Sequence, residues 1–242
     1  MTVTKQILLT GIFLSSLLFA GDPAVVTAAK NSDLSKLKAA ISSGESVNST
    51  GKGNATALMW ASKKNQHKMV GFLLSKGADV NAKDSAGFTA LIYACNEGNS
   101  KVVVTLVNNK ANINQVTNNN KTALTYAVYK GDFYSVKLLV DKGATLTIKD
   151  HIGSTVLGYA VQGESDETLK IVKYLADNGA DVNAQDDEGY TILMAASEAG
   201  NPAVVKFLLK SGAKKDVEDA DGSTALNYAE EEEHSSVVAL LK

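Results

Sequence analysis

A period of about 33 residues runs through most of the chain and constrains its fold more than any other feature. Six segments begin with threonine, carry leucine at their third position and end with alanine. The threonines are 33, 33, 33, 36 and 33 residues apart. A fixed period of this length predicts one supersecondary unit stacked many times around a continuous core. The six segments are Thr56–Ala61, Thr89–Ala94, Thr122–Ala127, Thr155–Ala160, Thr191–Ala196 and Thr224–Ala229.

A second marker follows four of the threonine segments and keeps the same period. It reads Gly-Ala-Asp-Val-Asn in its clearest copies, and apolar stretches such as Val204–Leu209 lie between the two markers. Apolar residues at helical spacing predict an amphipathic helix in each repeat. The copies of this second marker are Gly77–Asn81, Lys110–Asn114, Gly143–Thr147 and Gly179–Asn183.

Together these markers resemble the ankyrin repeat, and the resemblance covers residues 22–242. It implies an all-α solenoid of about seven repeats, each a β-turn followed by a helix-turn-helix unit. The implied organisation is a signal peptide with its helix at 1–20, an N-terminal capping repeat at 21–48, five repeats at 49–218 and a C-terminal capping repeat at 219–242. The family pattern Thr-Pro-Leu-His lacks its proline and histidine in every copy, so we expect modest stability.

The motif residues have local roles that elementary chemistry predicts. The threonine hydroxyl is expected to cap the first helix of its repeat. Glycine after the second helix suits left-handed backbone, so Lys110 in that place should be strained. Asn54 and Asn120 replace a turn glycine, which indicates positive φ. The asparagine that closes the second marker is expected to hydrogen-bond its own loop.

The first twenty residues predict a signal peptide. Lys5 precedes an apolar stretch of fourteen residues, Ile7–Ala20, which is short for a membrane span of ~20 residues. We expect cleavage after Ala20, a periplasmic or secreted location, and no stable membrane anchor afterwards. An uncleaved N-terminal anchor is the alternative.

Composition and scattered polar residues argue against several functions. All 24 basic residues are lysine, against 26 acidic residues, so the arginine forks that read nucleic acid are missing and no nucleic-acid partner is expected. His67, His151 and His234 lack ligand spacing and are interpreted as surface residues. The single cysteine, Cys95, excludes an intramolecular disulfide and is expected to be buried and inert rather than reactive. We therefore expect no enzyme activity, metal or cofactor.

A row of aromatic residues recurs at one place in the first helices and is broken once. Trp60 and four tyrosines occupy this place, whereas the sixth repeat has Ala195. We expect the rings to pack between repeats, with a ligand slot as the alternative. The four tyrosines are Tyr93, Tyr126, Tyr159 and Tyr228.

The resemblance also implies a partner-binding surface at the loop tips and at the ends of the first helices. Phe88, Ile152 and Tyr190 are expected at exposed tips, and Tyr129 at a helix end, because aromatic anchors are common hot spots. The alternative is that these tips pack on the neighbouring turn. Carried over by position, the candidate residues are Lys52, Lys63, Lys64, Phe88, Asn96, Glu97, Lys121, Tyr129, Lys130, His151, Ile152, Asp187, Glu188, Tyr190 and Glu198.

Charge is distributed unevenly along the predicted solenoid. Residues 22–83 carry 9 lysines and 4 acidic residues, net +5, whereas residues 183–242 carry 5 and 12, net −7. Such polarity can orient a partner or discourage end-to-end stacking. Three extra residues within Gly163–Thr168 mark either a binding face or tolerated drift.

These patterns predict a monomeric protein-binding scaffold of the cell envelope that binds a partner protein through its concave face. The alternative is an immunity or inhibitor protein that captures a toxin or a secreted enzyme. A hydrolase or metal enzyme is the third and weakest hypothesis, because no convergent acid–base set is present.

Overall fold

The computed structural model describes residues 21–163 and 167–242, so the predicted signal peptide and the centre of the three-residue insertion lie outside the described residues. Fourteen α-helices and one 3₁₀ turn are found in the described part. No helix among these residues is long and apolar enough to cross a lipid bilayer. The elements are α2 (Ala24–Lys30), α3 (Leu34–Ser42), η1 (Lys52–Asn54), α4 (Ala57–Lys63), α5 (His67–Ser75), α6 (Ala90–Asn96), α7 (Ser100–Asn108), α8 (Ala123–Tyr129), α9 (Phe133–Asp141), α10 (Val156–Val161), α11 (Thr168–Asp177), α12 (Ile192–Glu198), α13 (Pro202–Lys210), α14 (Ala225–Glu231) and α15 (Ser235–Leu241).

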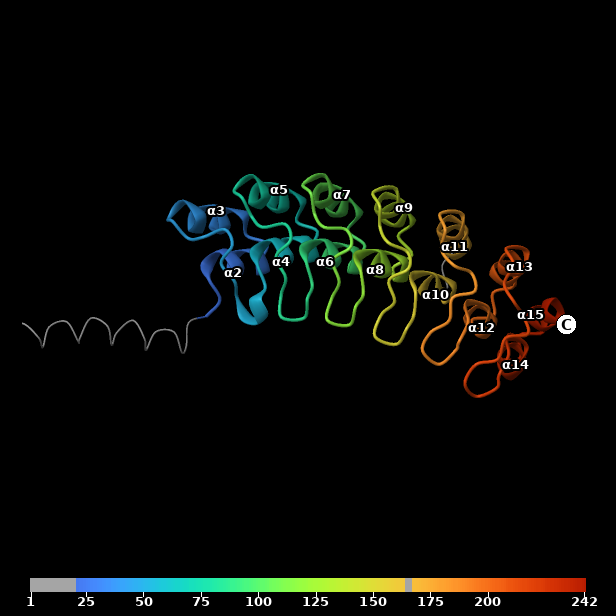
Figure 1. Cartoon of the computed structure of the whole chain (residues 1–242). Helices are drawn as coiled ribbons and strands as arrows, with labels where there is room; N and C mark the ends of the chain where they lie inside the picture. The colour runs from blue at the N-terminus through green and yellow to red at the C-terminus, as the bar shows by residue number, and fades with distance from the viewer. Residues whose placement is uncertain (1–20, 164–166) are drawn as a thin grey trace, which may run out of the picture.

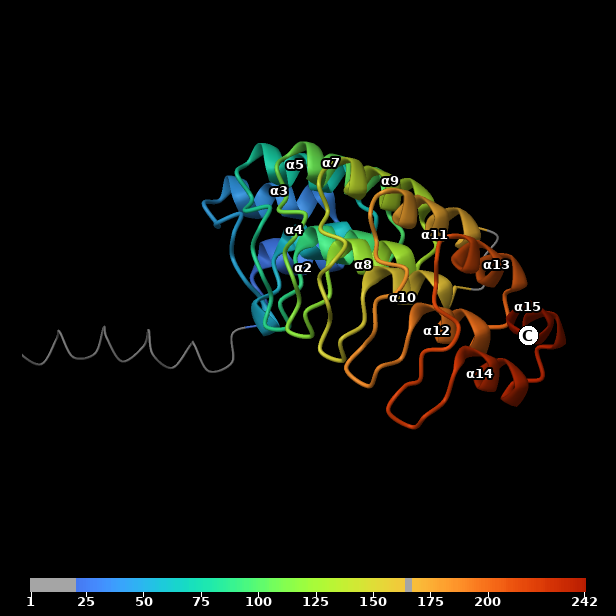
Figure 2. The ribbon, with the colours of Figure 1, turned by 45° about the vertical axis from the view of Figure 1, so that its right-hand side comes forward.

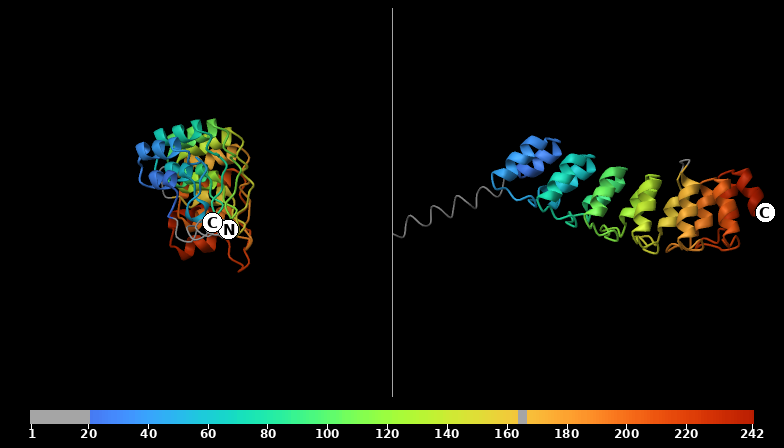
Figure 3. Two further views of the ribbon diagram at one scale, coloured as in Figure 1. Left: turned by 90° about the vertical axis from the view of Figure 1, so that its left-hand side faces the viewer. Right: turned by 90° about the horizontal axis from the view of Figure 1, so that it is seen from above.

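The helices form seven consecutive pairs, which we number as the first to the seventh repeat. Figure 1 shows the first helices of the pairs in one row and the second helices in another, with long loops projecting on the side of the first row. The pairs stand one behind another in the other views (Figures 2 and 3). The prediction of an all-α repeat solenoid is therefore confirmed.

The core lies between the two helix rows and continues from repeat to repeat. The motif leucines of the second to sixth repeats are at most 1% exposed, and they alternate with buried alanines that let the first helices pack closely. Leu226, the motif leucine of the seventh repeat, is only partly buried because it lies in the last repeat of the described chain and is covered from one side. The five buried leucines are Leu58, Leu91, Leu124, Leu157 and Leu193.

Six of the seven first helices follow a motif threonine, and the threonine side chain caps five of these six, as the sequence predicts. In each of the five, the hydroxyl accepts a hydrogen bond from the backbone N–H three residues later, as in Thr56 to Met59 at 3.3 Å. Thr155 occupies the same position but makes no capping bond. Its hydroxyl is buried without a hydrogen-bond partner among the described residues, so the prediction is wrong for the fifth repeat.

Left-handed backbone occurs where the sequence predicts it. Asn54 and Asn120 have φ of 60° and 58° in their turns. Lys110, which replaces the glycine after the second helix of its repeat, has φ of 66°. A residue with a side chain is strained in this region, so the expectation for Lys110 is confirmed.

Replacing Lys110 with glycine should raise the free energy of unfolding by about 1 kcal/mol. The change relieves a left-handed strain of roughly 1–2 kcal/mol, and the greater freedom of glycine in the unfolded chain offsets part of the gain. Urea unfolding followed by circular dichroism measures the difference. An unchanged or lower stability would show that Lys110 is not strained.

The asparagines that close the second marker act between repeats, which corrects the expectation that they bond their own loops. Asn114 donates from Nδ2 to the carbonyl of Gly143 at 3.1 Å and accepts at Oδ1 from the N–H of Thr145 at 2.8 Å. Asn183 makes the same pair of bonds to the next repeat. Thr147 holds this place after the fourth repeat, and the corresponding bridge is missing there among the described residues.

Candidate protein-binding surface

The loop tips form a continuous edge along the solenoid. We use "loop tips" for the turns at 51–54, 84–87, 117–120, 150–153, 186–189 and 219–222. A backbone hydrogen bond joins each tip to the next, as in the N–H of Asp187 to the carbonyl of Ile152 at 3.2 Å. In Figure 1 the repeats curve toward the side from which these tips project. We call the surface made by the tips and the adjoining first helices the loop-side surface.

An aspartate at the start of four tips fixes the turn. Its Oδ1 accepts one backbone N–H group within the tip and one from the residue just after it, as in Asp84 with the N–H groups of Ala86 and Phe88 at 2.9 and 2.8 Å. The tips are therefore preorganised, and binding there orders little backbone. The recurrence of this aspartate in the sequence is the signal of a role that the motif residues above did not include. The other three are Asp150, Asp186 and Asp219.

The aromatic row is tied to these tips. The second carboxylate oxygen of Asp84 accepts the hydroxyl of Tyr93 at 2.7 Å, and Asp219 accepts that of Tyr228 at 2.6 Å. Burial raises the pKa of Tyr93 most, and the hydrogen bond to Asp84 raises it further, so this hydroxyl stays protonated. The row rings are half-buried and support the tips, which favours the packing interpretation.

In the third and sixth repeats, an aromatic residue just before the capping threonine packs on the row ring of the next repeat. The ring of Phe88 lies 5.4 Å from that of Tyr126, and the ring of Tyr190 lies 5.1 Å from that of Tyr228. Both side chains are half-buried. The expectation that Phe88 and Tyr190 are exposed anchors is wrong, because each packs against the row ring of the next repeat.

Lysine side chains lie over other rings of the row. The ammonium of Lys121, which also precedes a capping threonine, lies 4.6 Å from the centroid of the Tyr159 ring and 3.8 Å from Asp150. Lys63 lies 5.7 and 5.5 Å from the ring centroids of Trp60 and Tyr93. These cation–π contacts place a positive charge over the row rings of the second, third and fifth repeats.

Eleven of the fifteen candidate residues are exposed. Tyr129 is 74% exposed and Ile152 is 50% exposed, so the expectation of exposure is confirmed for these two. Asn96 and Lys121 are half-buried, as are Phe88 and Tyr190. Whether any of them binds a partner stays a prediction. The remaining exposed residues are Lys52, Lys63, Lys64, Glu97, Lys130, His151, Asp187, Glu188 and Glu198.

An acidic hollow lies on the loop-side surface between the last two tips. Its walls are the rings of Tyr190 and Tyr228, and it encloses about 580 Å³, counting the space at its mouth. The hydroxyl of Tyr190 donates to Glu198 at one side. The hollow presents negative charge where the sequence is most acidic. Its carboxylates are Asp186, Glu188, Glu198, Asp219 and Asp221.

The residues considered for chemistry are dispersed. Cys95 is fully buried, and this burial raises the pKa of its thiol. His67 and His151 are exposed, whereas His234 is half-buried with Nε2 2.9 Å from the carbonyl oxygen of Glu198. No group of three or more metal-ligating side chains occurs within residues 21–163 and 167–242.

Comparison with known proteins agrees with this architecture. The human ASB11 ankyrin repeat domain superposes with a TM-score of 0.78 at 25% sequence identity, over 90% of this chain and 97% of that chain. No curated protein sequence matches the chain. The family model for ankyrin repeats (3 copies) matches residues 5–84, 81–150 and 157–242. The chain therefore belongs to the ankyrin-repeat family, whose fold is in general a non-catalytic scaffold for protein–protein interaction.

Proposed function

We propose that this protein is a binding module of the cell envelope that holds one partner protein on its loop-side surface. The exposure of Tyr129 and Ile152 carries the proposal. Large apolar side chains are normally buried, and aromatic residues at an exposed site are enriched among interface hot spots. Both residues lie on the surface that the family uses in general for binding, at the centre of the solenoid.

The charge distribution supports an oriented complex. The N-terminal part exposes Lys52, Lys63 and Lys64 on the loop-side surface, whereas the hollow at the other end is lined by carboxylates. A partner with the opposite polarity would be steered into one orientation, and its association would slow with added salt. This polarity fits a single specific partner better than promiscuous binding.

The envelope location rests on the N-terminal sequence. A positive residue followed by a short apolar stretch supports export to the periplasm or outside the cell. The function in that compartment is to hold, protect or help mature the partner. Capture of a toxin or secreted enzyme as an inhibitor is the second candidate, and the acidic hollow favours it where the captured enzyme is basic.

The paired substitution Tyr129→Ala/Ile152→Ala should weaken partner binding by about tenfold, because each removes an exposed apolar anchor. The partner is first isolated from periplasmic extract by affinity capture and identified by mass spectrometry. Titration calorimetry with the purified partner then gives the dissociation constant, and its activity with and without the protein separates protection from inhibition.

Tyr134→Ala is the matched control. Tyr134 is 61% exposed but lies at the start of α9, in the row of second helices. Its replacement should leave the dissociation constant unchanged, and all variants should retain the wild-type circular dichroism spectrum. Weakened binding in Tyr134→Ala with unaltered binding in the paired variant would place the interface on the opposite side.

A further inference from the structure

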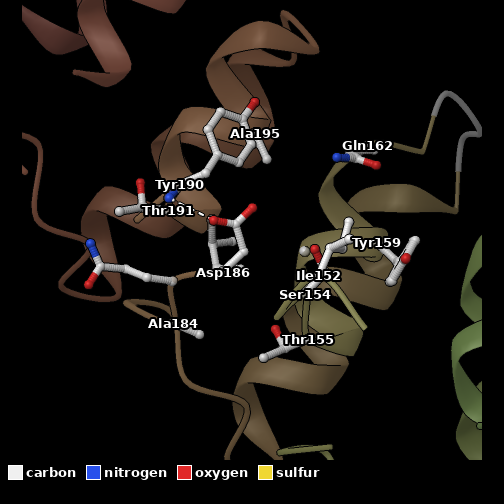
Figure 4. A pocket seen from close by; sticks show the side chains of 13 residues that line it. Ile152, Ser154, Thr155, Tyr159, Gln162, Ala184, Asp186, Tyr190, Thr191 and Ala195 are labelled. Carbon is white, nitrogen blue, oxygen red and sulfur yellow. Dashed lines mark hydrogen bonds between the residues drawn. The ribbon is translucent and has the colours of Figure 1, made fainter. Parts of the chain in front are cut away.

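A cavity opens where the aromatic row is broken. Ala195 stands at the place held by Tyr159 in the fifth repeat and Tyr228 in the seventh. Gly158 and Ser154 are also small and lie on the facing repeat. The cavity between the fifth and sixth repeats encloses about 450 Å³, counting the space at its open mouth. Figure 4 shows its lining side chains, which come from both repeats.

The same break leaves a hydrogen-bond acceptor unused. In the fifth repeat, Oδ2 of Asp150 accepts the hydroxyl of Tyr159 at 2.5 Å, and the third and seventh repeats repeat this bond. Asp186 keeps the turn-forming role, with Oδ1 2.9 Å from the N–H of Tyr190. Because Ala195 has no hydroxyl, Oδ2 of Asp186 has no donor among the described residues and points toward the gap between the repeats (Figure 4).

The side chains of Tyr159 and Tyr190 do not fill the cavity, because hydrogen bonds hold each of them elsewhere. Tyr159 lies on one side with its hydroxyl bonded to Asp150, and Tyr190 lies on the other with its hydroxyl bonded to Glu198. Both side chains are therefore held in place, and both line the cavity. Aromatic rings favour a third ring at tilted or offset geometry over a purely aliphatic group.

We propose that this cavity takes one tyrosine side chain of the partner protein, whose hydroxyl donates to Oδ2 of Asp186. The inserted ring stands where the row lacks its own and completes the contact that the other repeats make internally. This inference rests on the proposed function only in that the ligand belongs to a protein. Phenylalanine or leucine would fill the space but leave the carboxylate without its donor.

The residues of the partner that flank the inserted tyrosine are basic in this proposal. Glu188 and Glu198 are exposed and line the adjoining acidic hollow, and Asp187 is exposed next to Asp186. Residues 183–242 carry a net charge of −7. Lysine or arginine next to the inserted tyrosine would therefore be attracted, whereas an acidic segment would be repelled.

Synthetic tripeptides test the proposal without the natural partner. The probes are N-acetylated, C-amidated Lys-Tyr-Lys, Lys-Phe-Lys and Glu-Tyr-Glu, titrated into the full protein and followed by ¹H–¹⁵N NMR. Lys-Tyr-Lys should give saturable shifts at the amides of Gly158, Gln162 and Ala195. It should bind about tenfold more tightly than Lys-Phe-Lys, as expected for a hydrogen bond to a charged group. Glu-Tyr-Glu should bind more weakly still.

Two substitutions test separately the hydrogen bond to Asp186 and the room that the cavity provides for the ring. Asp186→Asn retains the oxygen that forms the turn and should reduce the preference for Lys-Tyr-Lys over Lys-Phe-Lys to near one. Ser154→Phe should fill the cavity, because Phe88 at the same position packs over the next repeat. Ser223→Phe is the matched control, since it changes the same position in the last repeat, and should leave peptide binding unchanged.

The outcomes distinguish this inference from the proposed function. Equal binding of the tyrosine and phenylalanine peptides, or shifts confined to other residues, would overturn the tyrosine assignment. Wild-type affinity of Ser154→Phe for Lys-Tyr-Lys would overturn it as well. Such a result leaves the proposed function intact if Tyr129→Ala/Ile152→Ala still weakens binding of the natural partner.

Discussion

Gly153→Ala should lower the free energy of unfolding by about 3 kcal/mol. Gly153 has φ of 79°, where a side chain costs roughly 1–2 kcal/mol. An added Cβ would also lie 2.5 Å from the backbone nitrogen of Asp187. Relief of that clash requires the fifth and sixth tips to separate, which adds about 1–3 kcal/mol and breaks the hydrogen bond from Asp187 to Ile152. Urea unfolding measured by circular dichroism gives the difference.

Gly222→Ala isolates the clash from the backbone strain. Gly222 has φ of 78°, and an added Cβ there would meet nothing within 4 Å. This variant should lose only about 1 kcal/mol, the left-handed cost alone. If both variants lost the same amount, the close approach of the two tips would not contribute to stability.

Asn114→Ala should lower the free energy of unfolding by about 2 kcal/mol. The substitution removes both hydrogen bonds that join this asparagine to Gly143 and Thr145 of the next repeat. Each such bond contributes roughly 0.5–1.5 kcal/mol net. The loss falls on an interface between repeats, so the unfolding transition should also become less cooperative, because solenoid cooperativity depends on nearest-neighbour terms.

Thr147→Asn is the converse change at the equivalent place. It introduces the asparagine that would bridge the fourth and fifth repeats as Asn114 and Asn183 bridge theirs. The variant should gain about 1 kcal/mol. Stability that falls in Asn114→Ala but does not rise in Thr147→Asn would indicate that the loop after α9 cannot adopt the bridging geometry.

Position in the repeat predicted which part of each unit faces the loop side, but it did not predict the exposure of individual side chains. Tyr129 and Ile152 are exposed as expected. Phe88 and Tyr190 are half-buried because each reaches the ring of the following repeat. That contact joins residues 38 positions apart in both cases, and only stacking brings them together. Burial at a tip therefore depends on the neighbour's side chain.

The sequence by itself determined the repeat, the helix starts and the left-handed turns, since these follow from period, capping and backbone sterics within a few residues. Tertiary structure decided what joins the repeats: the asparagine bridges, the tie between tip aspartates and row tyrosines, and the open cavity at Ala195. Those features depend on distances between side chains of neighbouring repeats or of distant positions within one repeat. The way the repeats stack sets these distances.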